Sequence, residues 1–149
     1  MSRGRWVFAA VAGLLVAAQF VPVDRTNPAP RGEIAPPAGV AAILERSCYD
    51  CHSNRTKWPW YSRVAPASWL VAHDVGEGRE HLNFSHWNEY PAKDRARLAD
   101  EAVEEVEKGE MPMKIYLLLH RGAKVDAGDL DVLRAWARED VSTGDRDSD

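Results

Sequence analysis

Cys48-Tyr49-Asp50-Cys51-His52 is the stretch around which the rest of the chain is organised. It contains the only two cysteines of the 149 residues, and a histidine follows the second cysteine directly. The pattern C-x-x-C-H is the attachment signature of c-type haem. Each thiol can add across one haem vinyl group to form a thioether, and the imidazole of His52 can bind the iron as proximal ligand. The motif therefore predicts one covalent haem c per chain.

Other uses of a cysteine pair fit the sequence less well. A structural zinc site needs four nitrogen or sulfur ligands, usually from a second C-x-x-C or an H-x-x-x-H pair, and the sequence contains neither. A thioredoxin-like dithiol needs a βαβ pattern around it, whereas the residues that flank this motif have helical periodicity. The sequence therefore favours haem attachment at this motif.

An export or anchor segment occupies residues 1–23. Arg3 and Arg5 precede an apolar run from Trp6 to Val23, in which Gln19 is the one polar residue. Its 18 residues lie between a long signal-peptide core and a short membrane helix. Cleavage after Ala18 would leave an apolar new terminus, so we favour an uncleaved anchor. The positive-inside rule places the remainder outside the cytoplasm, on the periplasmic side of the inner membrane, either anchored or secreted.

The charge of the exported part argues against a nucleic-acid partner. With Arg3 and Arg5 set aside, it carries 17 basic and 23 acidic side chains, a net charge of −6. Surfaces that bind nucleic acid are normally basic. An acidic surface instead attracts a basic patch on another protein. We therefore expect redox partner proteins with a basic docking patch, and a membrane contact through the amino-terminal segment.

The exported part divides into a linker, one domain and a tail. Residues 24–37 contain four prolines and little that could pack, which predicts an extended spacer that holds the domain away from the membrane. One haem-binding domain is expected over residues 38–140. A charged tail is expected to fray from about Glu139 and to cover residues 141–149.

The first and last predicted helices carry apolar stripes that suit each other. The stripe of the first helix, over 38–51, consists of Val40, Ile43 and Leu44. The last helix has Asp126 as a candidate N-cap and would bury Leu130, Leu133, Trp136 and Ala137. We expect Trp136 and Leu133 to pack against Ile43 and Leu44.

Two further helices are predicted between these. The second begins after Pro66 and runs towards Gly76 or Gly78, either of which could stop it. The third begins at Pro91 and has Gly109 as its carboxyl-terminal cap. Its apolar stripe is Leu98, Ala99, Ala102, Val103 and Val106. Its acidic residues, which indicate a solvated face, are Asp100, Glu101, Glu104, Glu105 and Glu107.

The segment 53–66 is irregular and rich in aromatic residues. Pro59 and Pro66 interrupt it, and it contains Trp58, Trp60 and Tyr61. Such rings need a large surface to pack against, and a haem edge is one candidate. Ordinary core packing is the simpler interpretation for each ring taken alone.

Five blocks of sequence resemble a known family. They are C-Y-D-C-H-S-N, W-P-W-Y-S-R-V-A-P-A-S-W, H-L-N-F-S-H-W, G-E-M-P-M-K-I-Y and L-R-A-W. Over about residues 38 to 138 the chain resembles the bacterial haem-binding domain family, a branch of small monohaem c-type cytochromes. The resemblance implies an all-α, cytochrome c-like fold in which the first and last helices cross and the haem lies in a hydrophobic slot.

The resemblance also implies roles for particular residues. Cys48 and Cys51 would be the thioether sites, His52 the proximal ligand and Met111 the distal ligand, and the protein would carry electrons. From the residues alone the distal ligand stays open. The candidates are Met111, Met113, His73, His81, His86 and His120. Gly109 and Pro112, which bracket Met111 with a helix stop and a fixed φ, favour it over Met113.

Three classes of function follow from the state of the sixth iron position. A methionine there favours an electron carrier, because thioether sulfur stabilises ferrous iron. An open position would suit a peroxidase-like enzyme, with His73 or His86 as acid or base, or a module for gas sensing or haem delivery. We expect a carrier and not an enzyme.

Overall fold

The computed structural model describes residues 2–146, with side chains described as far as residue 139. The α-helices are α1 (Arg3–Ala18), α2 (Ala38–Ser47), α3 (Tyr49–His52), α4 (Ala67–His81), α5 (Ala92–Glu107), α6 (Lys114–Leu119) and α7 (Ala127–Arg146). The short 3-10 helices are η1 (Trp60–Arg63), η2 (Phe84–Glu89) and η3 (Arg121–Ala123). No strand occurs between residues 2 and 146. The predicted all-α class is confirmed.

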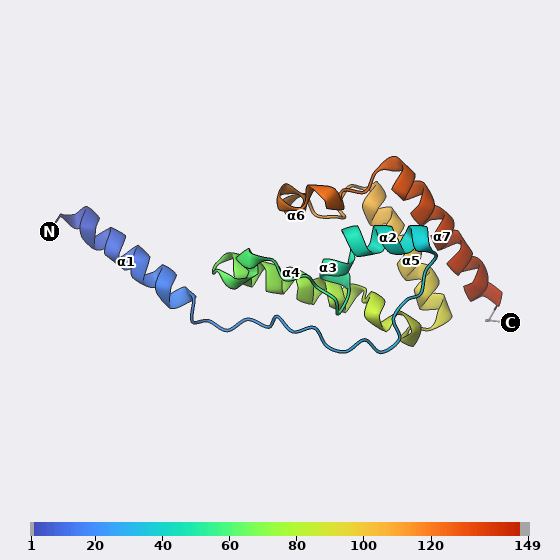
Figure 1. Cartoon of the computed structure of the whole chain (residues 1–149), viewed down its shortest axis with the longest axis horizontal. Coiled ribbons are helices and arrows are strands. Elements are labelled where there is room, and N and C mark those ends of the chain that lie inside the picture. The colour runs from blue at the N-terminus through green and yellow to red at the C-terminus, as the bar shows by residue number, and fades with distance from the viewer. Residues whose placement is uncertain (1, 147–149) are drawn as a thin grey trace.

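The helices form a layered domain with one outlying helix (Figure 1). α5 and α7 lie side by side, and α2 crosses α7, as the family resemblance implied. The crossing is close, because a Cβ atom placed on Gly39 of α2 would lie 3.8 Å from a methyl carbon of Val132 on α7. α4 and α6 extend from this core towards the side on which α1 lies (Figure 1).

The predicted packing of the first helix against the last is confirmed. Ile43 and Leu44 on α2 and Leu133 and Trp136 on α7 are all buried and belong to one apolar core. The same core includes Phe84 and Trp87 of η2, and the Trp87 and Trp136 rings lie 5.7 Å apart between centroids. Ring contacts of this kind add to the stabilisation from apolar burial.

Two helix ends follow the predicted capping chemistry. Gly109 has a φ of +72°, and its N–H donates to Val106 O while the N–H of Glu110 donates to Glu105 O, so α5 ends in a Schellman motif. At the start of α7, Asp126 accepts from the N–H of Asp129, as an N-cap does. α7 then continues to Arg146, past the point at which a frayed tail was expected. Residues 147–149 of that expected tail lie outside the described residues.

The predicted end of the second helix is wrong. α4 passes through both Gly76 and Gly78 and ends at His81. Glycine in a helix costs only about 1 kcal/mol relative to alanine, so packing can override it. The first predicted helix is also divided, because α2 ends at Ser47 and α3 begins at Tyr49.

The proline-rich segment is extended, as predicted, but it lies on the domain. Ile34 is buried, and its N–H donates to Phe84 O at 2.9 Å. Arg79 of α4 holds an earlier part of the segment, because it donates to Thr26 O at 3.0 Å and to Asn27 Oδ1 at 2.9 Å. The expectation that little of this segment could pack is therefore wrong.

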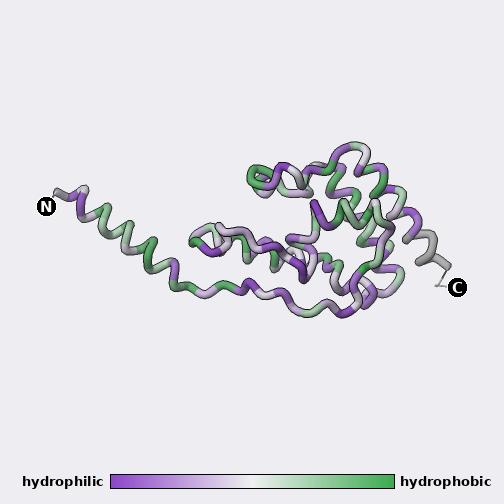
Figure 2. The backbone as a smooth tube through the Cα atoms, in the orientation of Figure 1, coloured by the Kyte–Doolittle hydropathy of each residue, from purple (hydrophilic) through white to green (hydrophobic). Residues whose placement is uncertain are grey.

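α1 carries the apolar amino-terminal run and has no buried residue (Figure 2). Judged by length and hydropathy, none of the helices within residues 2–146 meets the requirements for crossing a membrane.

Candidate functional site

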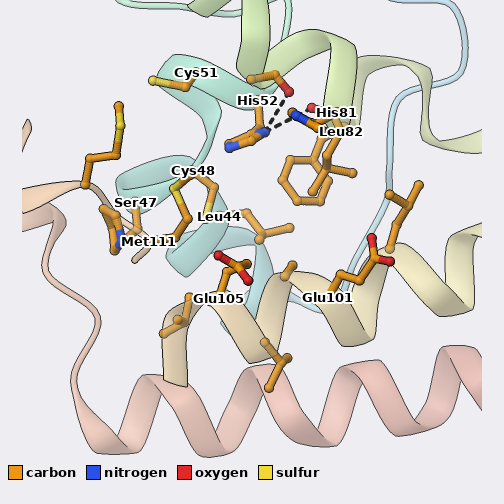
Figure 3. Close-up of a pocket in the computed structure, with 18 of the residues that line it drawn as sticks. Leu44, Ser47, Cys48, Cys51, His52, His81, Leu82, Glu101, Glu105 and Met111 are labelled. Carbon is orange, nitrogen blue, oxygen red and sulfur yellow. Dashed lines mark hydrogen bonds between the residues drawn. The ribbon is translucent and has the colours of Figure 1, made fainter. Parts of the chain in front are cut away.

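A cavity of about 740 Å³ opens between α3, α4 and α5 beside the cysteine motif (Figure 3). This volume lies within the range of roughly 300–1,000 Å³ that is typical of cofactor pockets. Its apolar wall comes from α2, α5, α7, the 3-10 helix η2 and the loop after α4, and consists of Leu44, Leu82, Phe84, Leu98, Ala102, Val103, Val106, Leu133 and Trp136. An apolar wall of this extent suits a flat hydrophobic ring.

Cys48 and Cys51 both line this cavity as free thiols. Burial is the main reason why the pKa of the Cys48 thiol rises to about 12 and that of Cys51 to about 11. Both sulfurs therefore stay protonated near neutral pH. Net addition of each S–H across a carbon–carbon double bond of a group held in the cavity would form a thioether.

His52 is held in one tautomer by two backbone carbonyls. Its Nδ1 lies 2.8 Å from Gly78 O and 3.1 Å from Leu82 O, both at the end of α4 (Figure 3). Because carbonyl oxygens only accept, Nδ1 must carry the proton and donate. Nε2 then keeps its lone pair free for a metal. Burial lowers the pKa of His52, against the effect of these two hydrogen bonds, and so favours the neutral ring that binds iron.

The family assignment follows from comparison with known proteins. The model of a family described as haem-binding domain matches residues 13–139, which is most of the chain. This protein belongs to the haem-binding domain family. No curated protein and no solved structure gives a match. The matched region begins inside α1, earlier than the resemblance over residues 38 to 138 suggested.

The cavity fits the haem that the family name implies. In addition to the apolar wall, the thiols and the imidazole, the buried hydroxyl of Ser47 lines the cavity. It is the one buried side-chain polar atom among the described residues without a hydrogen-bond partner. A bound group that offers an acceptor atom would satisfy it.

The haem-binding domain places both candidate methionines at this cavity. Met111 lines it and is 37% exposed, and Met113 lines it and also a smaller neighbouring cavity. The N–H groups of Glu110 and Met111 both donate to Glu105 O, at 3.0 and 3.1 Å, so the end of α5 fixes the position of Met111. The preference for Met111 over Met113 stays a prediction.

The four other histidines differ in where they lie relative to the haem cavity. His73, a candidate for the distal ligand, is exposed and does not line the cavity. His81 is exposed at the cavity, beside the Leu82 carbonyl that holds His52 (Figure 3). His86 lies 2.7 Å from Glu89 and 3.1 Å from Asn54. His120 stacks on Tyr116 at 4.1 Å and lines only the smaller cavity.

The aromatic loop does not supply a wall of the haem cavity. Trp60 is 77% exposed, and Trp58 donates to Asn27 Oδ1 and lies under Arg79. Tyr61 lines the smaller cavity of about 190 Å³. The suggestion that these rings pack against a haem edge therefore has no support in the positions of Trp58 and Trp60.

Carboxylates line the mouth of the haem cavity. They are Asp50, Asp74, Glu77, Glu80, Glu101, Glu104 and Glu105. In Figure 3, Glu101 and Glu105 rise from α5 on the side of the cavity opposite His52. Arg97, a cation at the same mouth, is paired with Glu101 at 2.7 Å. The sequence predicted only a solvated face here, because helical periodicity does not show where such a face meets a cavity.

The carbonyls that hold His52 were also missed. Any residue can supply a backbone carbonyl, so the identities of Gly78 and Leu82 gave no signal of this role. A side chain at position 78 would push the α4 backbone, and with it the Gly78 carbonyl, away from His52, because an added Cβ would lie 2.8 Å from Cys51 O.

Proposed function

We propose that this haem-binding domain is a monohaem c-type cytochrome that carries electrons and does not act as an enzyme. Cys48 and Cys51 would hold one haem c through thioethers, with His52 as the proximal ligand and Met111 as the distal ligand. Bound haem c would supply a one-electron couple between ferric and ferrous iron. The fixed tautomer of His52, with Nε2 free beside two thiols, is the observation that carries the proposal.

The remaining residues of the site suit a carrier better than a catalyst. An enzyme would need an acid or base at an open iron position. Neither His73 nor His86, the side chains considered for that role, lines the cavity, although His81 and several carboxylates do. The Met111 backbone, in contrast, is fixed at the cavity by the end of α5. A fixed methionine can occupy the sixth position and leave none for a substrate.

We further propose a basic redox partner and a tethered location. The carboxylates at the cavity mouth would attract a partner that presents lysines or arginines close to the haem edge. The apolar run in α1 would tether the domain at the periplasmic side of the inner membrane.

Carbon monoxide separates a carrier from the alternatives. The dithionite-reduced protein should bind carbon monoxide slowly and to a small extent, because Met111 must leave the iron first. Fast and complete binding would instead show an open sixth position, as a peroxidase-like enzyme or a gas-sensing module requires.

A further inference from the structure

The exposed large apolar side chains gather at two places. One is α1 together with the residues that follow it directly. The other, here named the apolar end, is formed by η1, the first turns of α4 and α6. It consists of Trp60, Val64, Trp69, Leu70, Ile115, Leu118 and Leu119. Elsewhere among the described residues, only Met111 and Val132 are large apolar side chains with comparable exposure.

α6 shows how strongly this end faces outwards. Leu118 is 71% and Leu119 is 67% exposed, and none of the six residues of α6 is buried. Single exposed leucines are normal on soluble proteins, whereas a gathered set marks an interaction surface.

The parts of the apolar end belong to one continuous surface. Leu70 of α4 and Ile115 and Leu119 of α6 line the same cavity of about 190 Å³. The Tyr61 hydroxyl, next to Trp60, reaches His120 just beyond α6 at 3.5 Å. The surface therefore spans both segments and the space between them.

The apolar end is also where the amino-terminal helix meets the domain. The Gln19 side chain forms two hydrogen bonds with the backbone of Ala65, accepting from its N–H at 3.0 Å and donating to its carbonyl at 3.2 Å. α1 extends away from that side of the domain (Figure 1), and it is mostly apolar along its length (Figure 2). The two groups of exposed apolar residues are thus neighbours.

The two sequence segments that carry the apolar end differ in charge from the haem cavity, although Asp50 and Asp74 line the smaller cavity between them as well. Residues 57–73 and 111–125 contain no aspartate or glutamate, although the chain as a whole has a net charge of −4. Their basic residues are Lys57, Arg63, Lys114, Arg121 and Lys124. A surface that combines tryptophan, leucine and basic side chains matches the interface of a bilayer with anionic lipids.

We propose that the apolar end rests on an anionic lipid bilayer, with Trp60, Leu118 and Leu119 in its interfacial layer. The inference rests on the proposed tether, which would bring this end of the domain to the membrane. A second copy of the chain suits the surface less well, because its basic residues would meet the same basic residues of the partner. α5, which carries three of the cavity carboxylates, lies towards the opposite end of the domain and would stay accessible to a soluble partner (Figure 1).

Lipid quenching of tryptophan fluorescence tests this contact in the full-length haem-loaded protein. Vesicles with brominated acyl chains would be prepared from phosphatidylcholine, with or without phosphatidylglycerol. The signal of Trp60 is the difference between the wild type and Trp60→Phe. We expect this signal to be quenched only in vesicles that contain phosphatidylglycerol. The double variant Leu118→Glu/Leu119→Glu should lose the quenching.

Val132→Glu is the matched control, because Val132 is an exposed apolar residue on α7 away from the apolar end. It should keep the quenching of Trp60. Neutralising the basic residues with Lys114→Gln/Arg121→Gln should abolish the quenching. Visible absorption of the haem would show that each variant is folded.

Three results would overturn the proposal. If the chain sediments with vesicles but Trp60 stays unquenched, the tether is supported and the contact of the apolar end with lipid is ruled out. If the chain does not sediment with vesicles, both the tether and the contact of the apolar end with lipid are ruled out. A dimer in detergent that dissociates in Leu118→Glu/Leu119→Glu would show that the apolar end pairs two copies.

Discussion

Gly78 of α4 packs directly against the backbone of Cys51, so that a Cβ atom on Gly78 would lie 2.8 Å from Cys51 O and 3.1 Å from its carbonyl carbon. The carbonyl oxygen of Gly78 also accepts a hydrogen bond from Nδ1 of His52, at 2.8 Å. One residue without a side chain therefore brings α4 against the motif and fixes the imidazole. The close approach explains why a glycine is needed inside a helix that it would otherwise weaken.

Gly78→Ala should lower stability and disturb the site. The added methyl group has to push α3 away from α4, and overpacking of this kind costs about 1–3 kcal/mol. Chemical denaturation monitored by circular dichroism would measure the loss. Gly76→Ala is the control, because nothing lies within 4 Å of its Cβ position. That change should stabilise α4 by about 0.5–1 kcal/mol, and equal losses in both variants would contradict the account.

Haem should stay on the chain after denaturation. Acid–acetone extraction releases haem that is held only by iron ligands, whereas thioethers to Cys48 and Cys51 would survive it. Mass spectrometry of the extracted protein should give the mass of the chain plus one haem. Cys51→Ala should give a poorly matured product. Free extraction of the colour from the wild type would show that no thioether forms.

Trp136→Ala should remove much of the stability of the domain. Trp136 is buried at the crossing of α2 and α7, where it contacts the ring of Trp87. Truncation of a buried tryptophan costs about 3–5 kcal/mol, a large part of the stability of a small domain. Thermal denaturation in detergent would measure it. Trp60→Ala, at a side chain that is 77% exposed, should change stability by no more than about 0.5 kcal/mol.

Glu105→Gln should raise the reduction potential. Glu105 lines the cavity from α5, and a nearby negative charge favours ferric over ferrous iron. We expect an increase of up to about 60 mV, which corresponds to a tenfold change in a one-electron equilibrium. Spectroelectrochemical titration would measure it. Asp100→Asn on the same helix, at a residue that does not line the cavity, should shift the potential much less. A shift of equal size in both variants would show that the overall charge of the protein, and not the position of Glu105, determines the change in potential.

The fold could be predicted where local chemistry and packing agree. Asp126 and Gly109 cap their helices as expected, because each satisfies backbone groups at a helix end by itself. Ile43 and Trp136 share a core, because their stripes recur at helical spacing. The end of α4 could not be predicted, since the close approach of Gly78 to Cys51 depends on a residue 27 positions away in the chain.

The site could be predicted only in part. The spacing of Cys48, Cys51 and His52 predicts haem attachment, since all three residues must act from one turn of the chain. The carbonyls that orient His52 carry no side-chain signal. The position of Glu105 at the cavity depends on how α5 packs against α7, which the spacing of acidic residues does not encode.

The near-infrared absorption band of ferric iron bound to methionine sulfur shows whether a methionine is the distal ligand. We predict that the wild type shows this band and that Met111→Ala loses it, with a lower potential and fast binding of carbon monoxide by the reduced protein. Met113→Ala should keep the band, although Met113 lines the same cavity. If Met111→Ala keeps the band and Met113→Ala loses it, the distal ligand is Met113. If the wild type has no such band, the claim of a His/Met carrier is wrong.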